Sequence, residues 1–168
     1  MNDKLIKKEI SATIPDWERE EIKKFWSPSR QVLRSIRDYQ KYSECKGILG
    51  MFWRKWNVLK HRFWSTVASC EIPINCQLEG GLLLTHPNGV IIHPKASIGV
   101  NCLILQQVTI VKGVTIGGHV DIGAGAKIIR PVTIGNHAKI GANAVVLCDV
   151  PEYATAVGIP ARIILNNT

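Results

Sequence analysis

The sequence predicts a β-helix of triangular cross-section preceded by a basic, α-helical region, and three observations lead to this prediction. A branched apolar residue occupies every sixth position from Ile92 to Val146. Two positions before each of these sites from Ile98 onward stands a small or β-branched residue, and residues two apart face the same side of a strand. Residues 1–70, in contrast, hold 15 of the 21 lysines and arginines and place apolar residues at helical spacing.

Length and composition limit the class of protein. The 168 residues suffice for one compact domain with a helical extension. No apolar run approaches the roughly 18 residues of a membrane span, and the first residues lack the apolar core of a signal peptide. The five cysteines form no C-x-x-C pair, so we expect neither a disulfide framework nor a zinc site. Free thiols fit a reducing, cytoplasmic location best.

Residues 1–70 are expected to form a helical cap of about three helices. One helix is predicted to start near Pro15, a second to follow the Ser27-Pro28 pair, and a third to span residues 47–68. Because an uncovered end of a solenoid would expose its core, a cap at the N-terminal end of the β-helix is required on physical grounds.

Within this cap, residues 30–64 carry nine lysines or arginines against two acids, with seven aromatic side chains between them. One interpretation is a set of amphipathic helices with solvated basic faces. The other is a peripheral membrane contact, in which these residues lie on anionic lipid headgroups at the inner membrane face. No recognised nucleic-acid-binding motif is present, so a nucleic-acid partner is not expected.

Residues 71–168 are predicted to form the β-helix and a short C-terminal tail. Three hexapeptides close one coil of 18 residues, and the residue after each isoleucine follows this longer period. Gly99, Gly117 and Gly135 form one column of such residues, and Gly123 and Gly141 belong to a second. We expect these glycines to supply the positive φ angles that tight corners need.

The repeat is interrupted once, between Leu84 and Ile92, where the step is eight residues instead of six. The two additional residues lie in the stretch THPNGV, which contains His86. We expect this insertion to bulge outward and to carry His86 into a groove between subunits. In that register Gln106 would stack above His86.

Four stretches of the chain resemble the serine acetyltransferase family: THPNGVIIHPKASIG, IGAGAKI, IGANAVVL and AVGIPARII. That family is a branch of the hexapeptide-repeat acyltransferases, and many relatives in the branch act on sugars. The resemblance covers residues 71 to about 165. It implies a left-handed parallel β-helix, acetyl-CoA as co-substrate and no metal. Because the groove needs a second wall, we expect a homotrimer; whether trimers pair is left open.

The chemistry of acetyl transfer requires a base that removes the hydroxyl proton as the oxygen attacks the thioester. An imidazole titrates near neutral pH and suits this role. His86 matches the family's base, and Glu71 stands 15 positions earlier, where the family has the aspartate that orients the base. The residues expected at the acceptor are Thr85, Asn88 and Lys112. Those expected at the coenzyme are Gly113, Ala124, Lys139, Ala142 and Arg162, with the Gly113 N–H as a donor to the oxyanion.

The sequence departs from the family at the acceptor. Thr85 replaces an aspartate, Gly113 replaces a second histidine, and the loop before it is shorter. We therefore predict O-acetylation of a sugar hydroxyl, in a cell-surface polysaccharide or its precursor. Serine O-acetylation for cysteine synthesis is the first alternative. A non-catalytic hexapeptide scaffold, with His86 idle, is the second.

Overall fold

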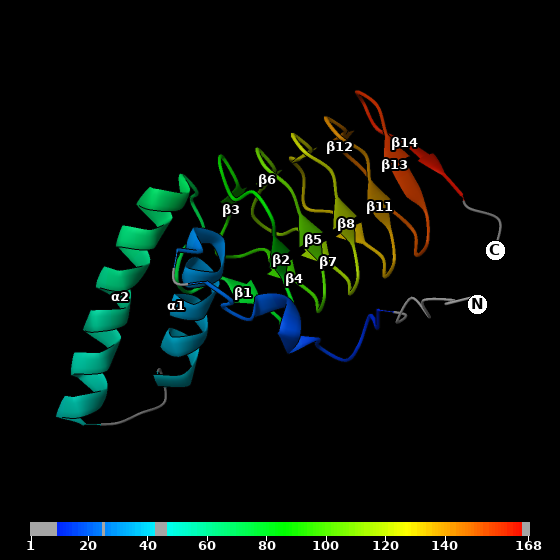
Figure 1. Ribbon diagram of the computed structural model, residues 1–168. Helices are drawn as coiled ribbons and strands as arrows, with labels where there is room; N and C mark the ends of the chain where they lie inside the picture. Colours follow the sequence, from blue (N-terminus) through cyan, green and yellow to red (C-terminus); the bar gives the residue numbers. More distant parts are fainter. Residues whose placement is uncertain (1–9, 25, 43–46, 166–168) are drawn as a thin grey trace, which may run out of the picture.

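The computed structural model describes residues 10–24, 26–42 and 47–165, and in it a stack of triangular coils is covered at one end by two helices (Figure 1). The helical elements are the 3-10 turn η1 (Trp17–Glu20) and the helices α1 (Pro28–Tyr42) and α2 (Ile48–Ala68). The stack grows from the helices toward the C-terminus, so the first coil lies next to them.

Three sheets form the sides of the prism, and within each sheet successive coils pair in parallel. One sheet contains β1 (Gln77–Leu78), β4 (Ser97–Ile98), β7 (Thr115–Ile116) and β10 (Thr133–Ile134). The second contains β2 (Leu83–Leu84), β5 (Leu103–Ile104), β8 (Asp121–Ile122), β11 (Lys139–Ile140), β13 (Thr155–Val157) and β14 (Arg162–Ile164). The third contains β3 (Ile91–Ile92), β6 (Thr109–Ile110), β9 (Lys127–Ile128) and β12 (Val145–Val146). The antiparallel hairpin β13–β14 ends the stack.

The side chains that recur every sixth residue form the core of the prism. Each of the ten from Ile92 to Val146 exposes no more than 3% of its surface. The small residues two positions earlier, such as Ala126 and Val108, are buried beside them. The register predicted from the repeat is therefore confirmed, and so is the fold class, a left-handed parallel β-helix behind a helical region.

The reason for the glycine columns differs from the prediction. Gly99, Gly117 and Gly123 do not have positive φ angles. A Cβ atom at Gly117 would lie 2.5 Å from the Asn136 side chain, and one at Gly123 would lie 2.6 Å from the Ala142 nitrogen. Glycine is needed there because consecutive coils approach closely. The left-handed corners instead use other residues: Asn101, Gln107, His119, His137, Asn143 and Tyr153, together with Gly81, Gly89, Gly113 and Gly125.

The two α-helices extend the core of the prism. Val32, Leu33 and Ile36 of α1 are almost fully buried, and they join Trp64 of α2 in the cluster that continues into the first coil. This arrangement confirms helices at the N-terminal end of the stack.

A polar link ties the helices to the first coil. His61 of α2 is buried, with Nδ1 2.8 Å from Ser35 Oγ and Nε2 2.8 Å from the carbonyl oxygen of Ile72. Burial lowers the pKa of His61, which keeps the imidazole neutral. The cap is thus joined to the coil by directional contacts as well as by apolar packing.

The helix predicted near Pro15 is a single 3-10 turn. Its side chains bond to the coils instead of to their own helix: Arg19 Nε donates to the Gly81 carbonyl, and Glu20 accepts from the Leu82 N–H. Glu20 also forms a salt bridge with Arg37 of α1. These tertiary contacts replace the helical hydrogen bonds, and at Glu21 the backbone is already extended.

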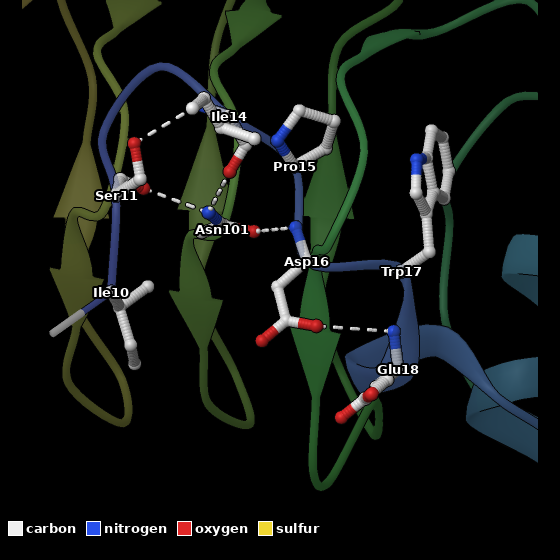
Figure 2. A pocket seen from close by; sticks show the side chains of 8 residues that line it. All are labelled: Ile10, Ser11, Ile14, Pro15, Asp16, Trp17, Glu18 and Asn101. Carbon is white, nitrogen blue, oxygen red and sulfur yellow. Dashed lines mark hydrogen bonds between the residues drawn. The ribbon is translucent and has the colours of Figure 1, made fainter. Parts of the chain in front are cut away.

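Residues 10–16 form a strap along one corner of the prism, which the sequence did not predict. Figure 2 shows the buried side chain of Asn101 beneath it. Its amide nitrogen donates to the carbonyls of Ser11 and Ile14, and its oxygen accepts from the Asp16 N–H, each at 2.7 Å. A Cβ at Gly118 would lie 1.9 Å from the Ala12 carbonyl oxygen, so the strap runs directly over that glycine.

None of the helices in the described part of the chain contains an apolar stretch long enough to cross a membrane.

Candidate functional site

The predicted insertion is visible as a break in the hydrogen-bond ladder between the first coils. Strand partners are 18 residues apart along most of the stack, as in Ile104 and Ile122, but Leu84 pairs with Ile104, 20 residues later. The ladder stops after the Leu83 N–H donates to the Cys102 carbonyl and resumes where the Gln107 N–H donates to the Asn88 carbonyl. The two additional residues are therefore confirmed.

These contacts correct the predicted neighbour of His86. Because Gln107 bonds to Asn88, Gln106 stacks on Asn88 and not on His86. Thr85, His86 and Pro87 together occupy the place that Leu105 alone fills in the next coil. The register shift is complete before Asn88, so His86 lies in the middle of the bulge, outside the repeating column. Its side chain is exposed.

A tight turn holds the end of the bulge. The Val90 N–H donates to the Pro87 carbonyl, and Gly89 has a φ of +68°, a value that glycine adopts without strain. The Gly89 N–H donates to the carbonyl of Ser69, the residue that caps α2. The bulge is therefore fastened to the helical cap as well as to the second coil.

Glu71 lies where the first coil begins, close to the end of the bulge. Its backbone forms a parallel bridge with Ile91, with its N–H bonded to the Val90 carbonyl. The side chains of Glu71 and His86 are both exposed, and no hydrogen bond joins them in the described structure. Orientation of His86 by Glu71 therefore stays a prediction.

The corner that starts at the bulge continues along the stack as a column of small or polar residues. Gly125 donates to the Gln106 carbonyl and Asn143 donates to the Ala124 carbonyl, so Asn88, Gln106, Ala124 and Ala142 succeed one another by one coil each. Ala124 is half-buried and Ala142 is exposed. This column leaves space for an extended ligand that starts at His86 and runs along the prism.

Basic side chains lie on both sheets that meet at this corner. Lys139 begins β11 beside Asp121, and Arg162 lies on the terminal strand β14; both are exposed. The structure adds Lys127 of β9, which was not predicted: its Nζ donates to the Gln107 carbonyl at 2.6 Å and to Thr109 Oγ1 at 3.1 Å. Lys127 ends the GAGAK motif, so the motif itself was the signal that could have identified it.

Lys112 and Gly113 lie at a different corner, between the sheet of β6 and the sheet of β7. A single chain therefore does not bring them to His86. The Gly113 N–H already donates to the Lys95 carbonyl at 3.2 Å. This contact corrects the prediction that Gly113 offers a free N–H to an oxyanion.

The third corner carries a pair of histidines under the strap. His119 Nδ1 and His137 Nδ1 are 2.9 Å apart, and the His137 ring stacks on Tyr153. Burial is the main cause that lowers the pKa of His119. In the described residues no group of three or more histidine, cysteine or acidic side chains could hold a metal ion. These histidines hold the coils and the strap together.

Figure 2 shows a hollow of about 380 Å³ beside Asn101, lined by Ile14, Pro15 and Trp17 among others. None of its lining residues belongs to the predicted site. The candidate site is therefore the corner of His86, Asn88, Ala124 and Ala142, and not this hollow.

Comparison with known proteins agrees with this fold and this corner. No family model matches the chain. The serine acetyltransferase of Synechococcus elongatus is 40% identical over 105 residues, which are 58% of this chain and 43% of that protein. The chain thus spans less than half the length of this curated relative.

Solved structures show the same likeness over more of the chain. The soybean serine acetyltransferase apoenzyme superposes with a TM-score of 0.69 at 32% identity, covering 83% of this chain and 58% of that one. A serine acetyltransferase in complex with CoA superposes with a TM-score of 0.63 at 29% identity, again covering 83% of this chain and 58% of the other.

Proposed function

Because this chain is a serine acetyltransferase-like member of the hexapeptide-repeat acyltransferases, we propose that it transfers an acetyl group from acetyl-CoA to a hydroxyl group. The observation that carries the proposal is the interruption of the repeat at residues 85–87. It breaks an otherwise regular ladder to present an exposed histidine at the start of a corner of small residues.

His86 acts in this proposal as the general base. Its imidazole takes the proton of the acceptor hydroxyl while that oxygen bonds to the thioester carbonyl carbon, and the thiolate of coenzyme A then leaves. Glu71 holds the imidazole in the tautomer that can accept the proton. Thr85 and Asn88 flank His86 and contact the acceptor. The coenzyme extends along Ala124 and Ala142, where Lys127, Lys139 and Arg162 provide positive charge for its phosphates.

A complete site in this proposal needs a second subunit. The corner of His86 is open, and Lys112 lies at another corner of the same chain. In a homotrimer, the Lys112 corner of one subunit can face the His86 corner of the next. Light scattering at micromolar concentration that shows only a monomer would remove the second wall and contradict the site.

Serine is the acceptor that the comparisons favour, because the relatives are named for it. The sequence analysis ranked a sugar hydroxyl first, and one observation still favours the sugar as a second candidate. Serine carries two charges that a small site must match, and an unmatched buried charge is costly. Thr85 is uncharged, and Gly113, whose N–H is already bonded to Lys95, brings no side-chain charge.

The experiment measures thiol release from acetyl-CoA with L-serine and with a panel of sugar nucleotides and oligosaccharides. Turnover with L-serine that is lost in His86→Ala supports the serine function, and turnover with a sugar alone supports the second candidate. His93→Asn is the matched control, since His93 Nδ1 accepts the Lys95 N–H in a turn of the next coil and an asparagine oxygen can do the same. A chain that neither binds acetyl-CoA nor releases thiol with any acceptor would be a non-catalytic scaffold.

A further inference from the structure

Helix α2 carries an apolar stripe on the side that faces away from the core. Its buried positions, such as His61 and Trp64, pack toward α1 and the first coil. On the opposite side, large apolar residues recur at intervals of three or four. They are Phe52, Trp56, Leu59, Phe63 and Val67, with exposed fractions from 36% to 61%. No described part of the chain covers this stripe.

The charge of α2 is entirely positive. The helix contains Arg54, Lys55, Lys60 and Arg62 and no acidic residue. Lys60 reaches Asp38 of α1. Lys55 and Arg62 project beside the apolar stripe, and no described carboxylate lies within ion-pairing distance of either. An apolar stripe with aromatic residues and flanking cations is the pattern of a helix that lies in a membrane interface.

A hollow of about 390 Å³ lies on the basic side of the same helix. It is lined by Tyr39 of α1 and by Met51, Arg54, Lys55 and Val58 of α2. Arg54 stacks over the Tyr39 ring, with its guanidinium carbon 5.8 Å from the ring centroid. Apolar walls with two cations at their edge suit the phosphate of an anionic lipid.

Charge also discriminates between the two occupants that such a stripe could bind. A second copy of α2 would bring cations against cations, because the helix offers no carboxylate to meet Lys55 or Arg62. An anionic bilayer matches both the charge and the aromatic stripe. We propose that α2 lies on the surface of a membrane rich in anionic lipids, with the stripe at the boundary of headgroups and acyl chains.

This surface goes beyond the proposed acetyl transfer and has a geometric consequence for it. The His86 bulge is bonded to Ser69, directly after α2, through the Gly89 N–H. The first coil is therefore the coil nearest the membrane, and the later coils extend away from α2 (Figure 1). His86 would lie close to the lipid surface.

The test is co-sedimentation of the full chain with vesicles of phosphatidylcholine alone and of phosphatidylcholine with phosphatidylglycerol. We expect binding only to the anionic vesicles, and binding that weakens with salt. Lys55→Gln with Arg62→Gln should bind about thirtyfold more weakly, from the loss of two surface cations. Trp56→Glu with Phe63→Glu should abolish binding. All four side chains project from the exposed side of α2, so circular dichroism should be unchanged.

Ile129→Glu is the matched control, because Ile129 is an exposed apolar residue of the prism with 46% of its surface accessible. It should bind vesicles like the unaltered chain. Equal binding to neutral and anionic vesicles would overturn the proposal, as would no binding at all. If Trp56→Glu with Phe63→Glu instead lowered the mass measured by light scattering and left vesicle binding unchanged, the stripe would be an interface between copies.

Discussion

Asn101 should contribute more to the stability of the chain than any other corner residue of its type. Its side chain makes three hydrogen bonds to the strap and is fully buried. At about 1 kcal/mol for each bond, their loss costs about 3 kcal/mol. Asn101 also has a φ of +59°, and an alanine in that conformation adds about 1 kcal/mol. We therefore expect Asn101→Ala to lower the free energy of unfolding by about 4 kcal/mol.

Two variants separate these contributions. Asn101→Gly removes the hydrogen bonds but accepts the left-handed conformation, so it should cost about 3 kcal/mol. Asn143→Ala tests the conformation alone, since Asn143 has a φ of +56°, is exposed and makes no side-chain hydrogen bond in the described structure. It should cost about 1 kcal/mol.

The assay is urea unfolding followed by circular dichroism, together with trypsin cleavage after Arg19. Arg19 is protected by its hydrogen bonds to the Gly81 and Cys102 carbonyls. If the strap detaches before the coils unfold, Asn101→Gly should speed this cleavage and leave the main transition in place. The reasoning is refuted if Asn101→Gly loses no more stability than Asn143→Ala and is cleaved no faster than the unaltered chain.

Three further predictions follow from the coils and the site. His86→Ala should lower turnover by about 10²- to 10⁴-fold with little change in coenzyme affinity, and Glu71→Gln should cost less; steady-state kinetics and calorimetry with CoA measure both. Gly123→Ala should destabilise the stack, because the new Cβ would lie 2.6 Å from the Ala142 nitrogen, whereas Gly113→Ala at an exposed corner should cost only about 1 kcal/mol; thermal unfolding compares them. Because burial lowers the pKa of His61, the unfolded chain binds a proton below about pH 6.5 that the folded chain refuses, so stability should fall with decreasing pH there; His61→Gln should flatten that part of the profile.

The repeat made the prism predictable, because every coil obeys the same local rule. An isoleucine on each sixth position can face inward only if the chain turns a corner in each hexapeptide, and the burial of Ile98 and Ile134 follows directly. The insertion was found for the same reason, since a single departure is easily seen in a regular series. The position of Leu84 against Ile104 agrees with it.

The errors concern contacts between residues that the repeat does not relate. The strap depends on hydrogen bonds from Asn101 to residues 85 to 90 positions away, and nothing local in the sequence indicates such a partner. The stacking partner of Gln106 depended on where within the bulge the register recovers, which is set by the turn at Gly89. Columns of glycine have two explanations, positive φ and close approach of backbones, and the sequence cannot distinguish them. Gly117 shows the second.

The bulge at residues 85–87 occurs in the first coil only, and this makes the prism a gauge of length. Each later coil adds 18 residues and about 4.8 Å along the axis, the spacing of neighbouring strands. Asn88 and Ala142 are three coils apart, or about 14 Å. Insertion of one coil between β5 and β8 would leave the surroundings of His86 intact and move the hairpin with Arg162 one strand spacing farther away. The number of coils, and no single residue, thus sets how long a ligand must be to reach from one end of the corner to the other.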